Sequence, residues 1–348
     1  MLNFIYWPIS WVLRFWHEVI GFAIPKDSGI SWILAIVLLT CTVRLLLLKP
    51  MVNQMRSTRK MQEMQPRMQE IREKYQGDQQ KIAEETQKLY REMGTNPLAS
   101  CIVPLVQMPI FIGLLHVLRS FNRTGTGGAG LGMSVEENRN TANYAFPAED
   151  VQSFLDADFF GVPLSAYMKM PQEAFAAFGT ADLTRAKIIA VCAPLVILCA
   201  AFTHLNARIM INRQEARKAA GKGPKPQGEM AEMMQSQMGM MNKLMLWFFP
   251  VMILATGVIW HIGLLFYMLT NNVWTFFQTK IVYAKMDKEE AEEEVVVDYN
   301  GGSLEIGFNV SYLLDVLGVM TTEQVRLILS DANSSALVQE AGNDDSSY

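Results

Sequence analysis

The chain has 348 residues, half of them hydrophobic, and a formal net charge of −4 at pH 7. Residues 287–348 hold 14 acidic and two basic side chains, a net of −12, so residues 1–286 carry +8. Apolar residues gather in long runs without charges, which argues against a soluble globular domain. Phosphate-binding loops, nucleophile elbows, metal-ligand spacings and disulfide frameworks are not visible. We therefore predict no enzymatic activity, no cofactor and no metal.

The N-terminal segment, residues 1–29, is rich in Trp, Phe and Ile but also carries Arg14, His17 and Glu18. This mixture predicts an amphipathic helix that lies in the membrane interface. A signal peptide is the alternative, and it is disfavoured because no basic leading region or small-residue cleavage site is present.

Five membrane spans are predicted from the apolar runs. Residues 244–279 carry no charge. As one helix they would measure about 54 Å at 1.5 Å per residue, which exceeds a hydrocarbon core of about 30 Å. We expect a turn at His261–Gly263 that divides this run into two spans. The predicted spans are 30–48, 98–118, 188–205, 244–260 and 264–282.

The loops between the spans differ in charge. Residues 49–97 hold ten Lys and Arg, and residues 206–243 hold seven. Residues 119–187 hold six basic and eight acidic side chains. Basic loops remain in the cytoplasm, so 119–187 is predicted as an outer loop, with the N-terminus outside and the C-terminus inside.

The first cytoplasmic loop predicts a coiled-coil hairpin over residues 51–93. Apolar residues recur at spacings of three and four on either side of Gly77, first from Met61 to Tyr75 and then from Ile82 to Met93. This periodicity is typical of two antiparallel helices. Pro66 should kink the first arm, because a proline inside a helix removes one hydrogen bond.

Polar residues inside the predicted spans are the candidate functional residues. Arg44 is the most demanding, since an arginine in a span is costly unless it faces water or reaches the surface. It lies five residues before Lys49, so reaching the cytoplasmic interface is one interpretation. A shared hydrated groove that binds substrate is the other, and ordinary hydrogen bonding between helices would explain the remaining polar residues without a groove. The candidates are Arg44, Thr40, Gln107, Asn271, Asn272 and Gln278.

Several motifs resemble the YidC/Oxa/Alb family of membrane insertases, in particular its actinobacterial members. The similarity covers about residues 1–290, with departures at Ser100, where the family usually has Gly, and at Met268, where it commonly has Trp. The motifs that carry the resemblance are Thr42–Leu45 with Lys49–Pro50, Met61–Pro66, Asn96–Cys101, Val106–Gly113, Thr203–His204 and Asn271–Thr275.

The resemblance implies an all-α polytopic protein of the bacterial cytoplasmic membrane, with a core at residues 30–286. Such an insertase would act without ATP or metal on nascent membrane proteins whose hydrophobic segment has a short, often acidic flank. The groove at Arg44 would accept that flank while the segment leaves between the third and fifth spans. Membrane lipids, the ribosome, a targeting factor and the Sec translocon are the further partners that the resemblance implies.

The C-terminal part has a different character. Tyr299–Leu317 resembles the C-terminal part of the bacterial DNA sliding clamp, so we interpret residues 295–348 as a small α+β appendage joined through the acidic residues 287–294. Strands are expected at 295–299, 304–308, 325–329 and 336–339, with a helix at 310–317. The chain is therefore predicted to be chimeric. A net charge of −12 over residues 287–348 argues against binding nucleic acid.

Two other functions would also place polar residues inside a membrane protein. A small-solute transporter should show internal repeats and interrupted helix pairs in matching halves, and none is visible. A structural scaffold would account for the coiled-coil hairpin but not for the polar residues within the spans.

Overall fold

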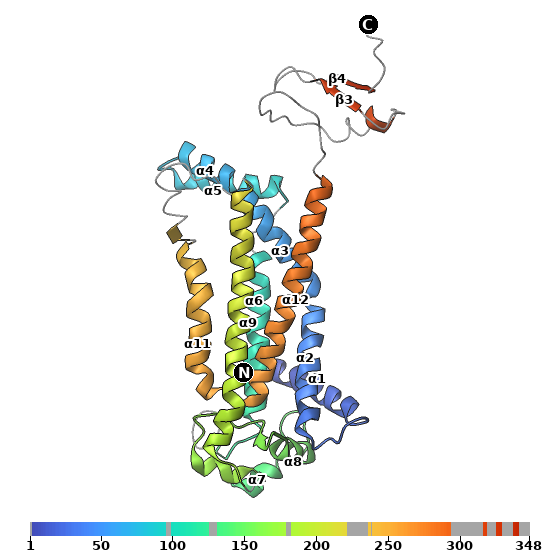
Figure 1. Ribbon diagram of the computed structural model, residues 1–348, viewed down its shortest axis with the longest axis vertical. Helices are drawn as coiled ribbons and strands as arrows, with labels where there is room; N and C mark the ends of the chain where they lie inside the picture. Colours follow the sequence, from blue (N-terminus) through green and yellow to red (C-terminus); the bar gives the residue numbers. More distant parts are fainter. Residues whose placement is uncertain are drawn as a thin grey trace. The chain divides into compact units, whose positions relative to one another are not determined.

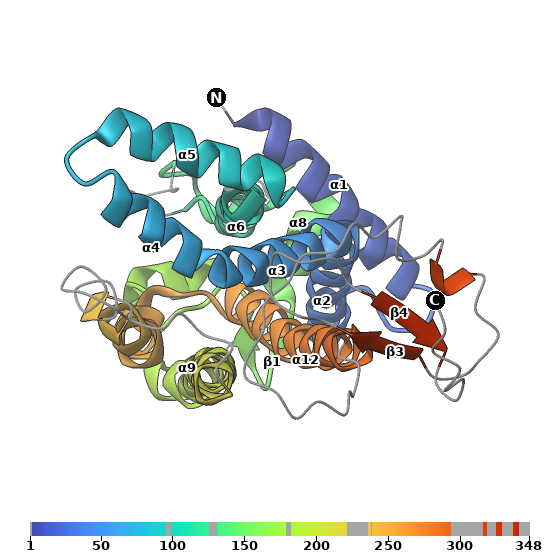
Figure 2. The same ribbon diagram turned by 90° about the horizontal axis from the view of Figure 1, so that it is seen from above.

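The computed structural model describes residues 2–94, 99–124, 131–178, 182–220, 236–237 and 239–293, and three short pieces at 316–318, 325–328 and 337–340 (Figure 1). The chain divides into two compact units, Met1–Glu289 and Glu290–Tyr348. The first unit is mainly helical, with its long helices side by side (Figures 1 and 2).

The first helix, α1 (Asn3–Ile20), is amphipathic, as its sequence predicts. Leu13 and His17 are fully buried where α1 packs against α2 and α6, while an aromatic face opposite them is exposed. That face consists of Phe4, Trp7, Trp11 and Phe15. The next helix, α2 (Gly29–Leu46), begins where Ser28 Oγ accepts the backbone N–H of Ile30 at 3.3 Å, which satisfies a donor left free at a helix start.

The predicted hairpin consists of α3 (Leu48–Glu63), α4 (Gln65–Lys74) and α5 (Gln79–Glu92). Its first arm is interrupted at Met64, and Pro66 occupies the first turn of α4, where a missing N–H costs nothing. The two arms run side by side (Figure 2), and Tyr90 donates its hydroxyl to Met68 Sδ at 3.6 Å. The kink expected from the proline is thus a complete break between two helices.

Between α6 (Ala99–Arg119) and α9 (Arg185–Ala219), the connecting segment folds into a small unit that we call the cap, described at residues 120–124, 131–178 and 182–184. It contains α7 (Val135–Arg139), α8 (Ala148–Asp156), the strands β1 (Asp158–Phe159) and β2 (Val162–Pro163), and the 3-10 helix η1 (Gln172–Ala177). Phe121, Phe146 and Phe154 are fully buried around the Trp32 ring of α2, with ring centroids 5.0–5.8 Å away. These aromatic contacts hold the cap on the N-terminal end of α2.

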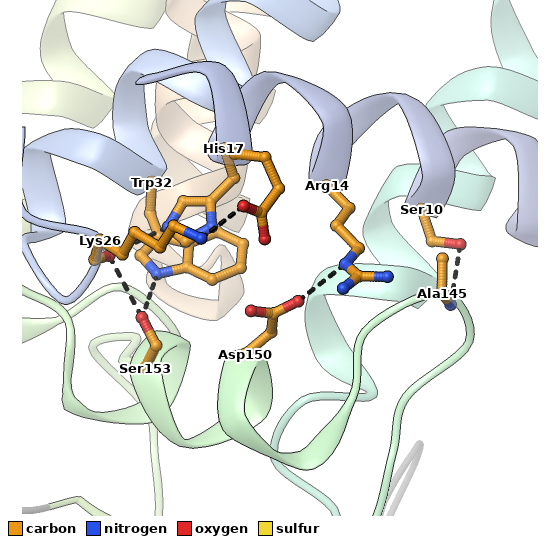
Figure 3. A network of polar contacts seen from close by, with 9 residues as sticks. Ser10, Arg14, His17, Lys26, Trp32, Ala145, Asp150 and Ser153 are labelled. Carbon is orange, nitrogen blue, oxygen red and sulfur yellow. Dashed lines mark hydrogen bonds and ion pairs between the residues drawn. The ribbon is translucent and has the colours of Figure 1, made fainter. Parts of the chain in front are cut away.

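A network of polar contacts attaches α1 to the cap (Figure 3). Arg14 Nε donates to Asp150 Oδ2 of α8 at 3.0 Å, and Trp32 Nε1 donates to Ser153 Oγ at 3.1 Å. His17 Nε2 lies 3.0 Å from the carbonyl oxygen of Lys26 and must carry the proton, because a carbonyl only accepts. The His17 ring is stacked on Trp32, with centroids 3.7 Å apart. The N-terminal helix, α2 and the cap therefore form one packed region.

The second half of the helical unit begins with α9 (Arg185–Ala219), a helix of 35 residues. It is longer than the predicted span 188–205 and extends into the segment expected to be a cytoplasmic loop. The helix continues through residues 206–219 because they contain good helix formers and no Gly or Pro.

A π-helical turn, η2 (Leu244–Phe248), precedes α11 (Phe249–Thr256) and the 3-10 turn η3 (Gly257–Ile259). The chain then turns at residues 260 and 261, next to the expected position, and α12 (Ile262–Glu293) follows. The backbone N–H of Gly263 donates to Leu164 O of the cap at 2.9 Å. Since α12 extends to Glu293, the acidic joint expected at 287–294 largely continues this helix.

Three helices in the described ranges are long and apolar enough to cross a membrane: Gly29–Leu46, Arg185–Ala219 and Gly239–Ile259. In α6 the apolar stretch found is shorter, Leu105–Arg119. The 32 residues of α12 suffice in length, but Asn271, Asn272 and Gln278 reduce its apolar character. The structure thus supports three of the five expected spans.

In the C-terminal unit, β3 (Val325–Ile328) pairs antiparallel with β4 (Leu337–Glu340), with Val325 opposite Glu340. These strands coincide with two of the strands expected from the sequence. Residues 316–318 are helical, at the end of the expected helix. The strands expected at 295–299 and 304–308 lie outside the described residues.

Candidate functional site

Arg44 lies near the end of α2 and is only 4% exposed. Its Nε donates to Asn271 Oδ1 at 2.7 Å, and its Nη2 donates to Thr275 Oγ1 at 2.8 Å and to the Asn271 carbonyl at 3.3 Å. Its Nη1 points at Met51 Sδ, 3.4 Å away. The guanidinium is therefore held between α2, α3 and α12 and does not extend to the surface.

In the described part of the chain, the hydrogen-bond partners of this guanidinium are electrically neutral: an asparagine, a threonine and a methionine. Among the carboxylates that the structure describes, none forms an ion pair with Arg44. A buried charge with hydrogen bonds but no counter-charge remains costly. Among the described residues, the positive charge at this position therefore has hydrogen-bond partners but no carboxylate beside it.

Asn272 contacts the opposite neighbour of α12. Thr203 Oγ1 of α9 donates to Asn272 Oδ1 at 3.3 Å, and Asn206 Nδ2 donates to the Asn272 carbonyl at 3.1 Å. The Oδ1 atom of Asn206 is buried and has no hydrogen-bond partner among the residues that the structure describes. The two adjacent asparagines of α12 therefore connect it to two different helices.

A cavity of about 370 Å³ lies between α3, α9, α12 and the segment η2–α11. Of the predicted residues, Asn272 and Gln278 line it. Thr275, which was not among them, lines the cavity and also binds Arg44. Polar side chains from α9 and α12 share the lining with methionines from three segments. The lining residues are Met51, Gln54, Met55, Thr203, Asn206, Ala207, Met210, Met245, Phe249, Asn272, Thr275, Gln278, Thr279 and Tyr283.

The other predicted residues lie outside this lining. Thr40, one turn before Arg44, donates to the Ile36 carbonyl of its own helix at 2.7 Å. Gln107 of α6 donates to the Tyr267 hydroxyl at 2.7 Å, one turn before Asn271 on α12. Thr40 is thus satisfied within α2, whereas Gln107 helps to fix α12 beside α6.

A histidine shapes one wall of the cavity. His204 Nδ1 lies 2.9 Å from the carbonyl oxygen of Leu246 and donates to it. In an α-helix this carbonyl would accept from residue 250, but Pro250 has no N–H. His204 supplies the missing donor within η2, between the lining residues Met245 and Phe249.

Several residues of this region were not among the predicted site residues: Met51, Thr203, Asn206, Tyr267 and Thr275. One signal was available. Thr275 follows Asn271 by four residues, and positions four apart lie on one helix face. Thr203 and Asn206 form a similar pair, three residues apart, on the long helix α9.

At the far end of the cavity, ion pairs join α12 to both neighbours. Arg56 of α3 binds Glu289 at 2.8 Å, and Arg213 of α9 binds Asp287 at 2.6 Å. The Arg213 guanidinium also lies over the Tyr283 ring, 4.1 Å from its centroid. These contacts hold α12 between α3 and α9 beyond the cavity.

The C-terminal part of the chain matches a second family. The model of the DNA polymerase III beta subunit, C-terminal domain, matches residues 277–348. A beta sliding clamp of Pseudomonas putida KT2440 is 80% identical over 71 residues, which are 20% of this chain and 19% of that clamp. The chain thus spans about a fifth of the clamp's length, and this match supports the chimeric interpretation.

The helical unit has relatives of its own. A membrane protein insertase YidC of Mycobacterium tuberculosis H37Rv is 42% identical over 290 residues, 83% of this chain and 74% of that protein. A membrane protein insertase YidC of Mycobacterium leprae is 39% identical over 299 residues, 85% and 74% of the two chains. The model of the family described as 60Kd inner membrane protein matches residues 23–290. The family match covers most of the length of this chain and agrees with the motifs found in the predicted spans. The chain therefore belongs to this family of bacterial inner membrane proteins.

Proposed function

We propose that the protein is a membrane insertase that lowers the cost of bringing the polar flank of a nascent transmembrane segment into the bilayer. The observation that carries this proposal is Arg44, a buried guanidinium with only neutral partners. The names of its relatives give the general activity, and the cavity beside Arg44 supports the mechanism.

The positive charge determines which flank benefits. A charge at the centre of a membrane span costs about 2.5–3.5 kcal/mol on the insertion scale. An acidic flank that enters the cavity approaches Thr275, and behind it the unpaired Arg44, so part of that cost is offset. In this proposal, water fills the polar part of the cavity, and substrates with acidic flanks depend most on Arg44.

The exit path follows from the cavity walls. α9 and α12 flank the cavity, and methionines from α3, α9 and η2 contribute flexible apolar surface. A hydrophobic segment would leave between α9 and α12 into lipid while its flank stays near Arg44. Five spans, with α6 and α12 added to the three apolar helices, would place the cap outside and the hairpin in the cytoplasm, as the basic loops favour.

Partners follow from this orientation. The basic hairpin α3–α5 would face the ribosome, a targeting factor or acidic lipid head groups, and the Sec translocon would act beside the spans. Neither ATP nor a metal is required by this mechanism, because the free energy of binding the flank beside Arg44 offsets part of the cost of bringing it into the bilayer. The clamp-like unit has no part in it.

Replacement of Arg44 tests the mechanism. Arg44→Ala should reduce insertion of substrates with acidic flanks about tenfold, which corresponds to about 1.4 kcal/mol. Arg44→Lys should retain much of the activity because the charge remains. Insertion is measured as protease protection of newly made substrates in insertase-depleted membranes that contain equal amounts of each variant.

The matched control is Lys187→Ala, which removes one positive charge from an exposed position at the outer end of α9. It should leave insertion unchanged. Full activity of Arg44→Ala with several acidic-flank substrates would disprove the role of the buried charge, even if the protein remains an insertase by another route.

A further inference from the structure

The cap presents one unusual turn. β1 pairs with β2 so that Phe159 lies opposite Val162, and Phe160 and Gly161 form a two-residue connection. Both have positive φ, +53° at Phe160 and +74° at Gly161. Such primed turns favour Asn-Gly or Gly-Gly, since Asn and Gly tolerate this backbone region. Asp158 Oδ1 accepts the Gly161 N–H at 2.8 Å and stabilises the turn.

Phe160 is unfavourable here in two ways. The left-handed conformation is strained for a residue with a side chain, because Cβ lies too close to the following carbonyl oxygen. The ring is also 82% exposed, and among the described aromatic side chains it contacts Phe159 alone, edge-on at 4.5 Å. An asparagine would form the same turn in water without either cost. The contacts within the helical unit therefore do not account for an aromatic residue at this tip.

The hairpin lies beside the outer ends of the spanning helices. A Cβ atom on Gly29, the first residue of α2, would lie 1.8 Å from the Asp158 carbonyl oxygen, so the two backbones touch. The Phe159 ring meets Phe266, in the second turn of α12, edge-on at 5.1 Å. Ile30, next to the contact at Gly29, is 54% exposed. The tip is thus at the level where the apolar run of α2 begins.

We propose that Phe160 is a lipid anchor, with its ring in the interfacial layer of the outer leaflet. Aromatic rings at this depth bury apolar surface among head groups and upper acyl chains, and that burial would offset the cost of the left-handed turn. The depth is set by contact with α2, one of the three apolar helices. The proposal therefore depends on α2 crossing the membrane and does not depend on the groove at Arg44.

The anchor would complement the aromatic face of α1. Both α1 and β1 contact α2, and they lie on different sides of it (Figure 2). If the face formed by Phe4, Trp7, Trp11 and Phe15 also meets lipid, the cap is attached to the outer leaflet on two sides. The cap would then resist tilting relative to the spans.

Spin labelling tests the depth of the tip. In a variant of the full chain without native cysteines, Phe160→Cys is labelled in phosphatidylglycerol and phosphatidylethanolamine vesicles. Collision with oxygen, which concentrates in lipid, is compared with collision with a water-soluble nickel chelate. Leu34→Cys, exposed on α2, is the membrane control. Val135→Cys, exposed on α7 at the far end of the cap, is the aqueous control (Figure 1).

The Phe160 label should favour oxygen over the nickel chelate, as the Leu34 label does. A nickel preference like that of Val135 would overturn the proposal, and so would a label that reaches neither reagent, since another protein would then cover the tip. If Leu34 itself prefers nickel, α2 does not span the membrane and the anchor fails with it. The Arg44 experiment would still decide the insertase mechanism separately.

A second measurement keeps the aromatic ring. Photo-crosslinking p-benzoyl-phenylalanine at position 160 should attach lipid acyl chains, detected by mass spectrometry, whereas the same residue at Val135 should not. Phe160→Asn should preserve the cap, because asparagine accepts the left-handed conformation. A folded Phe160→Cys without oxygen preference, together with no lipid adduct at position 160, would refute the anchor.

Discussion

At the scale of single residues, the adjacent asparagines of α12 contact two different helices. Asn271 holds the Arg44 guanidinium of α2, while Asn272 binds Thr203 and Asn206 of α9. Neighbouring residues on an α-helix point about 100° apart, so a polar pair can serve two sides of one helix. Exchange of either asparagine would therefore disturb a different helix contact, and only Asn271 acts on the buried charge.

His204 gives a residue-scale prediction. His204→Leu should lower the thermal stability in detergent, because the Leu246 carbonyl next to Pro250 loses its donor, and an unsatisfied buried group costs about 1–3 kcal/mol. His204→Asn should lose less, since the asparagine amide can place a donor near the former Nδ1 position. Thermal unfolding of matched detergent samples measures both. Equal losses would indicate that the ring contact with Trp247 matters and the hydrogen bond does not.

His17 predicts a dependence on pH. Burial lowers the pKa of His17 below 6.5, and this outweighs the nearby carboxylates of Asp150 and Glu18. Its Nδ1 is buried without a partner in the described part of the chain, so a second proton would have no acceptor there. The folded state therefore prefers neutral His17, and stability should fall as the pH drops from 6.5 toward the folded-state pKa, by at most about 1.4 kcal/mol per pH unit.

The check compares thermal unfolding at pH 7.5 and pH 5.5 for the natural chain and His17→Gln, whose amide can still donate to the Lys26 carbonyl. The loss of stability should be smaller in the variant. The same loss in both proteins would show that another group causes the pH dependence.

Helix α12 combines several roles at the scale of elements. Its N-terminal end is bonded to the cap through Leu164, its middle carries the asparagines, and its C-terminal end is paired with α3 and α9. Its partners lie on helices distant in sequence, which fixes it against movement relative to the bundle. The part of the hairpin formed by α4 and α5, in contrast, follows an interruption at Met64.

That difference predicts how the hairpin contributes. Replacement of Met61–Met93 by a short Gly/Ser linker should leave α3, with Met51 and Met55 of the cavity lining, largely in place. If the hairpin recruits substrate or ribosome, insertion should slow severalfold at low substrate concentration and recover at high concentration. Reconstituted vesicles with purified nascent-chain complexes provide the measurement. Unchanged rates at every concentration would indicate a solvated face without a partner.

At the scale of the whole molecule, the chain joins two segments that match unrelated families. The matches to the inner membrane protein family and to the clamp domain overlap at residues 277–290, within α12. The described strands of the C-terminal unit expose Leu327, Ile328 and Leu337. A unit this small with exposed strand residues is marginal in stability and open to proteolysis.

Truncation after Glu294 should therefore keep insertion activity and raise the yield of intact protein. The matched control ends after Met286, which also removes Asp287 and Glu289, the partners of Arg213 and Arg56. The control should be less stable than the first truncation. Yield on immunoblots and the protease-protection assay measure both. Loss of activity in the chain ending at Glu294, with expression preserved, would show that the C-terminal unit contributes.

The sequence predicted the positions of the apolar helices better than the contacts between them. Uninterrupted apolar runs identified α2 and α9, because length and lack of charge are local properties. The pairing of Arg44 with Asn271 is not local, since 227 positions separate the two residues. The cap was predicted only as an outer loop, because its aromatic core is collected from short segments without helical or strand periodicity. A span at 264–282 was expected, but α12 continues to Glu293 through charged residues, which an apolar run does not indicate.

Gly29 has a consequence for the range of sequences that can adopt this structure. Its missing side chain allows the Asp158 backbone to approach the start of α2, and even a methyl group would overlap that carbonyl. In a complete set of substitutions at position 29, glycine should be the sole residue that preserves the native contact. Genetic variation in the cap is thus limited by one position outside it, and changes in the two would have to arise together.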